Sequence, residues 1–505
     1  MTHSLAWFLL ADPTGADSWA TPWLEPLRQT PWTDWPGFWI GRLTFGRQAV
    51  LYFLPLLAVL LAWPTRQLRS GIILTGVVFM AYVFGPLYLL LWLLTCVIFY
   101  QAGQTLATRF AHPGGPSRWV IAVAIGLLGG HLVLVHSLGQ LKLPGEWNTW
   151  LVAHAPWLLP LGARGLAGEP HWFASGGFEL FDVLLGRAHD IGAAYLTMRM
   201  VAYFAELRRG TIPPQRRRFA DFLAYVCYAP TLIQGPLERY TEFQEQIETC
   251  QQRRRGGDRA AGAARFFLGL LKNAVAQGYL HPLLVTLDVS ASAKSAYYRQ
   301  PEQIQSYALL FFGVHLQVLL LYLAFSGYCD VAIGLSRLLG YRVIENFRRP
   351  WLACSLTDMW RRWHISLSFI LRDYVFFPLA RRRWNTTLSL LITFWVCGFW
   401  HDAGGKYTTW GVAMGLMVAV NQKWSRWMRE LDRHPQRRLA ALRRAWLKLR
   451  PLPRLCAWLL AQNAFLMSGW ICLGGSGALR VVWELIRRPA QWLLQPWGVA
   501  LAPLS

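Results

Sequence analysis

The sequence predicts an all-α polytopic membrane protein with about 10 to 13 membrane-embedded helices, because long apolar stretches recur along it. Hydrophobic residues make up 54% of the 505 residues and charged residues only 15%, against about 25% in soluble domains. Lys and Arg (50) outnumber Asp and Glu (26), and they cluster between the apolar stretches, as in cytoplasmic loops. This pattern excludes a disordered chain, and it argues against an ordinary soluble enzyme and against a nucleic-acid-binding protein.

The apolar stretches differ in length and charge, and a membrane helix needs about 20 apolar residues. Seven stretches contain no Asp, Glu, Lys or Arg: 48–65, 71–100, 119–139, 222–237, 306–329, 384–400 and 455–479. Weaker candidates, which are shorter or carry charges, are 150–161, 178–200, 266–287, 408–420 and 481–501. Gly85 and Pro86 interrupt the stretch 71–100, so this stretch forms either one tilted helix or two shorter helices.

The domain organisation follows from these stretches. Residues 1–47 are rich in Trp and Pro and are expected to form an N-terminal interfacial segment rather than a signal peptide. Residues 48–505 are expected to form a single transmembrane domain that ends in helices within 455–505. The segment 423–454 is rich in Lys, Arg and Trp, which is typical of an amphipathic cytoplasmic segment on anionic lipid headgroups. A surface that docks a partner protein is the alternative.

Several functions are disfavoured by missing motifs. The eight Cys are scattered without a CxxC pair or a Cys/His metal spacing, so no metal site is expected. The sequence contains no G-x-S-x-G, Walker A, G-x-G-x-x-G or HExxH motif, which argues against a serine triad, nucleotide hydrolysis and zinc proteolysis. Matching halves, which would indicate an inverted-repeat transporter, are not evident.

Polar residues that loops do not explain concentrate between residues 325 and 411. Asp330 ends an apolar stretch and is either a solvated helix end or the anchor of a buried basic residue. Ser355 and Asp358 form the pattern of a capping box, so a helix is expected from Met359 onward, with Trp360 and His364 on one face. Such a helix either lies in the membrane interface or lines a polar cavity.

His401 ends the apolar stretch 384–400. An ionisable side chain at this place is a site hypothesis by default, although a hydrogen-bonded structural histidine is the alternative. Burial disfavours the imidazolium, so His401 is expected to be neutral at about pH 7. A neutral imidazole can take the proton of a hydroxyl that attacks an acyl carbonyl. General-base acyl transfer from a thioester, whose thiolate leaves readily, is therefore the chemistry that remains.

Four segments of this region resemble motifs of the membrane-bound O-acyltransferase (MBOAT) family. They are 228–240 (YAPTLIQGPLERY), 325–350 (FSGYCD…ENFRRP), 360–374 (WRRWHISLSFILRDY) and 399–411 (FWHDAGGKYTTWG). The resemblance covers about residues 220–425. It implies a ring of membrane helices around a central tunnel, in the cytoplasmic (inner) membrane.

The resemblance also implies roles for individual residues. His401 resembles the catalytic histidine, and His364 resembles a second functional histidine of the bacterial subgroup. Residues implied to bind substrate or to brace the tunnel are Trp360, Arg361, Arg362, Trp363, Asn346, Asp330, Arg239 and Asp402. Asp402 departs from the family pattern, which has a small residue there, and it is expected to orient His401 or to raise its pKa.

The expected reaction is O-acetylation of an exported cell-surface polysaccharide. The resemblance implies no bound cofactor, with acyl-CoA (most simply acetyl-CoA) or an acyl-carrier-protein thioester as the cytoplasmic co-substrate. It also implies membrane lipids and a periplasmic or extracellular acyltransferase or glycan acceptor as partners, and no nucleic acid. The alternatives are D-alanyl transfer from a carrier protein to a cell-wall polymer, acylation of a secreted protein or lipid, and a transporter without chemistry.

Overall fold

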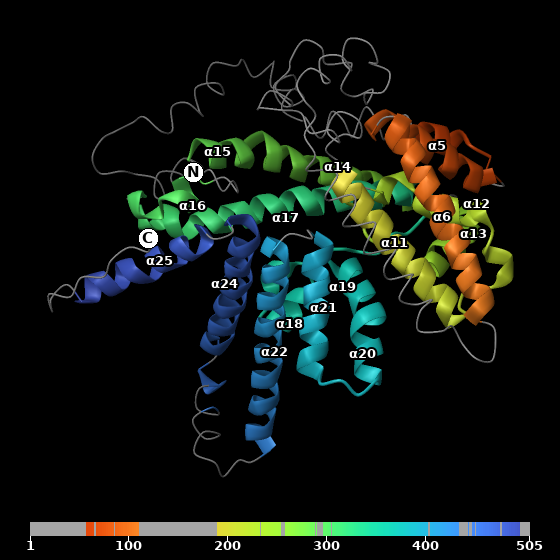
Figure 1. The fold of residues 1–505 in the computed structure, drawn as a ribbon. Coiled ribbons are helices and arrows are strands. Elements are labelled where there is room, and N and C mark those ends of the chain that lie inside the picture. Colours follow the sequence, from red (N-terminus) through yellow and green to blue (C-terminus); the bar gives the residue numbers. More distant parts are fainter. Residues whose placement is uncertain are drawn as a thin grey trace, which may run out of the picture.

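The computed structural model describes most of the chain and is helical wherever it is regular. The described residues are 57–110 (without 65, 66 and 85), 189–287 (without 233 and 254–257), 289, 296–401 (without 305), 405–433, 443, 447–449 and 451–494 (without 475 and 476). Every regular element within them is a helix, so the all-α prediction is confirmed. Helices α14 (Asp258–Val275) to α17 (Tyr307–Leu338) cross the middle of the molecule, and α21 (Thr386–His401), α22 (Gly405–Arg433) and α24 (Leu452–Gly474) run away from them (Figure 1).

The N-terminal helices gather on one side, at the right of Figure 1. They are α5 (Leu68–Phe84), α6 (Pro86–Phe110), α11 (His189–Arg209), α12 (Phe219–Val226) and α13 (Tyr240–Arg253). The apolar stretch 71–100 is thus divided between two helices, α5 ending at Phe84 and α6 beginning at Pro86, because proline has no N–H to continue a helix.

The stretch 222–237 does not form one embedded helix, so this expectation was wrong. Helix α12 ends at Val226, and a short 3-10 turn, Ala229–Thr231, follows. Pro230 and the pair Gly235-Pro236 interrupt helical hydrogen bonding. The side chain of Arg199 in α11 donates hydrogen bonds to the carbonyl oxygens of Tyr225 (2.7 Å) and Val226 (3.2 Å), so it satisfies the free C-terminal end of α12.

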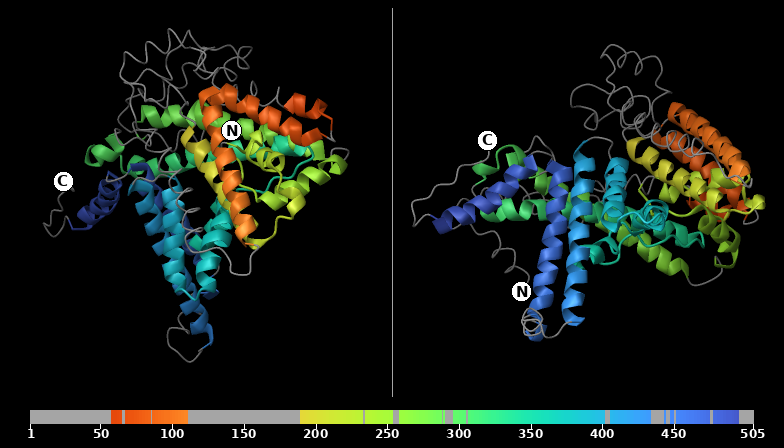
Figure 2. Two further views of the ribbon diagram at one scale, coloured as in Figure 1. Left: turned by 45° about the vertical axis from the view of Figure 1, so that its right-hand side comes forward. Right: turned by 60° about the horizontal axis from the view of Figure 1, so that its bottom comes forward.

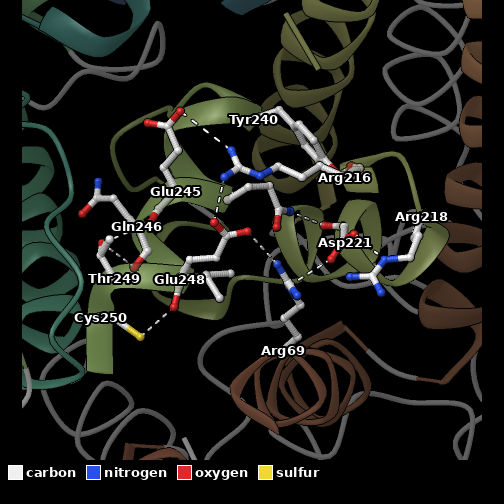
Figure 3. A network of polar contacts seen from close by, with 12 residues as sticks. Arg69, Arg216, Arg218, Asp221, Tyr240, Glu245, Gln246, Glu248, Thr249 and Cys250 are labelled. Atoms are coloured by element: carbon white, nitrogen blue, oxygen red, sulfur yellow. Dashed lines mark hydrogen bonds and ion pairs between the residues drawn. The ribbon is translucent and has the colours of Figure 1, made fainter. Parts of the chain in front are cut away.

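A charged network joins this group of helices (Figure 3). Asp221 in α12 is fully buried and forms ion pairs with Arg69 (2.9 Å) and Arg218 (3.0 Å). Glu248 in α13 contacts Arg69 (3.3 Å) and Arg216 (2.7 Å). Because Arg69 lies in α5, these side chains fasten α5, α12 and α13 to one another.

Glycines allow α14 (Asp258–Val275) and α17 (Tyr307–Leu338) to pack backbone to backbone. A Cβ atom on Gly269 would lie 2.5 Å from the carbonyl oxygen of Gly327, and one on Gly262 would lie 3.1 Å from that of Gly334. The two pairs run in opposite chain directions, so the helices are antiparallel. Two shorter helices, α15 (His281–Thr286) and α16 (Ala296–Arg299), connect them.

The C-terminal part begins with short helices and continues with long ones. Its helices are α18 (Leu356–Trp360), α19 (Ile365–Leu371), α20 (Phe377–Arg381), α21 (Thr386–His401), α22 (Gly405–Arg433), α24 (Leu452–Gly474) and α25 (Gly477–Leu494). Helices α22 and α24 lie side by side (Figure 2). The first part of the basic segment 423–454 is the end of α22.

Helix α17, with 32 residues, is the one described helix that is long and apolar enough to cross a membrane. Leu68–Ala81 and Thr386–His401 are shorter apolar helices. The predicted stretches 119–139 and 150–161 and the N-terminal segment 1–47 lie outside the described residues. The closed ring and its tunnel therefore stay predictions.

Candidate active site

The structure brings His364 and His401 together from different parts of the fold. His401 is the last residue of α21, and His364 lies between α18 and α19. Their ring centroids are 6.4 Å apart. His364 is 2% exposed, whereas His401 is exposed. The two imidazoles thus form a pair with one buried and one accessible member.

Aromatic rings surround the pair. Trp400 lies 4.7 Å from His401 and 6.1 Å from His364, between ring centroids, and its indole N–H donates to the carbonyl oxygen of Ala194 in α11. Tyr407 and Trp410 of α22 lie 5.8 and 5.6 Å from His401. Such apolar walls weaken competition from water, so polar groups between them interact strongly.

The predicted continuous helix from Met359 through His364 was wrong. Ser355 is confirmed as the N-cap, because its hydroxyl accepts a hydrogen bond from the N–H of Asp358 (3.1 Å). However, α18 ends at Trp360, and His364 has a left-handed backbone with φ of 46°, which non-glycine residues rarely adopt. Trp360 and His364 therefore do not share one helix face.

The helix breaks because a distant segment takes its hydrogen bonds. The N–H of Ile365 donates to the carbonyl oxygen of Asn346 (3.0 Å), and the N–H of Arg348 donates to that of Arg362 (2.9 Å). The side chain of Asn346, which is fully buried, contacts His364 Nδ1 (3.2 Å) and the N–H and hydroxyl of Ser366 (3.2 and 2.9 Å). Asn346 thus holds the buried imidazole directly.

The tryptophans and arginines next to His364 lie around the pair rather than between its rings. Trp360 packs against Trp410 (6.1 Å between centroids), which itself contacts His401. Trp363 packs against Phe347 (5.1 Å). The Arg361 side chain is exposed. Arg362 forms an ion pair with Asp358 (2.9 Å), so it stabilises the turn between α18 and α19.

Asp330 anchors basic residues inside the protein, which decides between the two alternatives left open by the sequence. It lies within α17, is 2% exposed, and forms ion pairs with Arg265 and Lys272 of α14, each at 2.6 Å. Arg265 also contacts Glu345 (2.6 Å), the residue before Asn346. Asp330 thus links the packed helices α14 and α17 to the segment that holds His364.

Arg239 braces the segment that follows α19. Its guanidinium contacts Glu242 (2.7 Å) and Asp373, and Asp373 lies in a π-helical turn, Arg372–Phe376. Arg209 donates to the carbonyl oxygen of Asp373 (2.6 Å). Asp402 lies outside the described residues.

Sequence reasoning missed several buried polar residues. Arg199 is 2% exposed and Glu206 is 3% exposed, both in α11, and Glu206 accepts a hydrogen bond from the N–H of Thr241 (2.9 Å). Arg199 falls within the apolar stretch 178–200, where an ionisable side chain is itself a signal. Lys272 carried the same signal, because it falls within the apolar stretch 266–287. Arg265 lies just before that stretch and looks like an ordinary helix charge until Asp330 is placed beside it.

The described residues form a helical structure that holds two imidazoles among aromatic rings. The model of the MBOAT, membrane-bound O-acyltransferase family, matches residues 137–469. The chain belongs to this family, which confirms the resemblance and places the chain in a membrane.

Named relatives narrow the subgroup. The chain is 34% identical over 264 residues to the probable alginate O-acetylase AlgI of Pseudomonas putida, which covers 52% of this chain and 49% of that protein. It is 29% identical over 258 residues to the peptidoglycan O-acetyltransferase of Helicobacter pylori (50% and 43%). It is 27% identical over 308 residues to the teichoic acid D-alanyltransferase of Streptococcus thermophilus (58% and 69%). The match spans about half the length of the two acetyltransferases.

Proposed function

We propose that the protein is an O-acyltransferase that moves an acetyl group from a cytoplasmic thioester to a hydroxyl of an exported cell-surface polysaccharide. The observation that carries the proposal is the His364–His401 pair. Two imidazoles from separate elements lie 6.4 Å apart, one accessible and one buried, within the part of the chain that matches the family. An accessible imidazole with a buried neighbour suits a general base that must meet a substrate.

The reaction balances without a metal or redox cofactor. The acceptor hydroxyl oxygen attacks the thioester carbonyl carbon, and His401 takes the hydroxyl proton. The new C–O bond forms, the C–S bond breaks, and the proton passes from His401 to the departing sulfur. General-base help of this kind contributes about 10²–10⁴-fold to the rate.

The choice of acetyl rests on the relatives. The chain is 31–34% identical to the alginate O-acetylases and 25–27% identical to the D-alanyltransferases. Acetyl-CoA is accordingly the donor of first choice, at the cytoplasmic face of the inner membrane. A periplasmic or extracellular glycan, or a partner acyltransferase that passes the acetyl group on, is the acceptor.

Turnover of radiolabelled acetyl-CoA tests the proposal. The full chain in proteoliposomes, supplied with a polysaccharide whose hydroxyls can accept the acetyl group, is expected to release free CoA thiol, and His401→Ala is expected to slow this release about 100-fold or more. His315→Ala is the matched control, because His315 of α17 contacts the carbonyl oxygen of Phe311 (2.8 Å) and lies outside the pair.

Each other outcome has a clear meaning. Full turnover in His401→Ala would remove His401 as the base. If the protein consumes a D-alanyl thioester of a carrier protein but no acetyl-CoA, the transferred group is D-alanine and not acetyl. If neither thioester is consumed, the transferase proposal fails.

A further inference from the structure

We infer that Asn346 is a positioning residue that holds neutral His364 in the tautomer with the hydrogen on Nδ1, so that Nε2 offers a lone pair inside the site. This inference rests on the proposed function for its consequence, although its geometry does not. It assigns opposite roles to the two edges of one buried ring: one edge is held by the protein, and the other is left for the reaction.

The orientation of the Asn346 amide follows from its neighbours. The main-chain N–H of Ser366 can only donate, and it points to one end of the amide at 3.2 Å. That end must therefore be the oxygen Oδ1. The other end, Nδ2, donates to the sulfur of Cys329 (3.3 Å), which is a weak acceptor. With the amide oriented in this way, the Ser366 hydroxyl donates to the same Oδ1 (2.9 Å).

The tautomer of His364 follows from the amide. Nδ1 of His364 lies 3.2 Å from the same Oδ1, and an oxygen that cannot donate requires a hydrogen on Nδ1. A neutral imidazole carries one such hydrogen, so Nε2 has none and is an acceptor. Nε2 is buried and has no hydrogen-bond partner among the residues that the structure describes, and buried polar atoms without partners are rare in folded proteins. An unsatisfied lone pair here indicates a place where a ligand or a reacting group completes the site.

The surroundings of His364 show which group this lone pair affects. Phe325 and Trp400 pack on the ring at 4.8 and 6.1 Å between centroids. The titratable side chains facing it are His401 from α21, at 6.4 Å, and Cys329 from α17, through Asn346. No hydrogen bond joins the two imidazoles, both of which the structure describes. Because His401 is the titratable ring in direct contact with His364, our inference assigns to the Nε2 lone pair the stabilisation of the imidazolium that forms on His401 when it takes the hydroxyl proton, which an N–H at Nε2 would oppose.

A main-chain hydrogen bond fixes the position of Asn346 independently of its side chain. The main-chain oxygen of Asn346 accepts the N–H of Ile365 (3.0 Å), and this bond does not depend on the Asn346 side chain. A side-chain variant at position 346 therefore keeps the paired segments together while it changes what His364 Nδ1 meets. This property allows positioning to be separated from folding.

The first test reads the tautomer without any turnover. The full chain, with nitrogen-labelled histidine, is reconstituted in lipid and its imidazole nitrogens are observed by NMR; His364→Ala assigns the signals. We expect a protonated Nδ1 and an unprotonated Nε2 for His364 in the wild type, and loss of this single state in Asn346→Ala. A hydrogen on Nε2 in the wild type overturns the inference, even if acetyl-CoA is consumed.

The second test uses the pH dependence of acetyl-CoA turnover. Asn346→Asp keeps an acceptor at Oδ1 but adds a negative charge beside Nδ1–H, which favours the protonated ring. We expect the acidic limb of the pH–rate profile to move to higher pH by about one unit, with kcat largely retained above it. Asn346→Ala should lower kcat on the order of 100-fold with little change in KM.

A structural role alone would give a different result. In that case Asn346→Asp and Asn346→Ala would lower the folded yield alike and would leave the pH profile of the surviving enzyme unmoved, and the inference would be wrong. Asn463→Ala, which removes an amide bonded to the Leu459 carbonyl oxygen in α24, is the matched control. If the NMR result holds while no thioester is consumed, the proposed function fails and the positioning remains.

Discussion

Asp330 and His364 are equally hidden, each 2% exposed, but their polar atoms are satisfied in opposite ways. Both Asp330 oxygens have a cationic partner at 2.6 Å. His364 is held at Nδ1 by Asn346, whereas no residue in the described part of the chain is bonded to its Nε2. We expect a buried charge with complete pairing to stabilise the fold, and a buried ring with one unbonded nitrogen to act in turnover. The contrast separates the residues that should control stability from those that should control turnover.

The largest expected effect on stability is that of Asp330→Ala. It leaves Arg265 and Lys272 without their shared carboxylate, and breaking a buried ion pair costs about 3–5 kcal/mol. Unfolding of the purified protein in mixed micelles by added denaturing detergent measures this loss. Asp258→Ala is the control, because its pair with Arg342 (2.7 Å) is largely exposed and should contribute at most about 1 kcal/mol. Equal losses in the two variants would contradict the assigned role of Asp330.

A smaller effect is expected from Gly269→Ala. The added Cβ would lie 2.5 Å from the Gly327 carbonyl oxygen and 2.6 Å from the Val331 nitrogen, so α14 and α17 must separate, at about 1–3 kcal/mol. Gly405→Ala is the control, since nothing lies within 4 Å of the added atom. The same unfolding assay measures both, and a neutral Gly269→Ala would mean that the two helices are not tightly packed there.

The smallest effect is expected at the start of α18. Ser355→Ala removes the N-cap hydroxyl that accepts the Asp358 N–H (3.1 Å), and such a loss costs about 1 kcal/mol. Ser355→Asp retains an acceptor and should restore most of the stability. If Ser355→Asp is as unstable as Ser355→Ala, the hydroxyl does not act as a cap. Turnover per folded molecule should change little in either variant.

Local sequence patterns predicted several individual helix boundaries correctly. Pro86 marked the break between α5 and α6, and Ser355 marked the start of α18, because both act on neighbouring residues. The end of α18 could not be predicted, because Asn346 competes for the backbone of Ile365 from 19 positions earlier in the chain. The local sequence near His364 predicts a continuous helix, but the hydrogen bond from the distant segment at Asn346 interrupts it.

The candidate site likewise contains residues that the sequence alone identifies and contacts that only the fold shows. The two histidines could be singled out from the sequence, since ionisable residues stand out in an apolar region. The family resemblance also named Asn346 and Asp330, but the sequence did not show which side chains they contact. Arg265 lies 65 positions from Asp330, and the role of Asn346 depends on a contact 18 positions away, so both require the fold.

A double-mutant cycle on His364 and His401 tests the central claim most directly, with turnover of acetyl-CoA by full-length protein in proteoliposomes as the readout. Residues that act as a unit are not additive. His364→Ala and His401→Ala are each expected to slow turnover about 100-fold or more, and the double variant should be about as slow as the slower single variant. Losses that multiply, or a single variant with wild-type turnover, would show that the two imidazoles do not form one site.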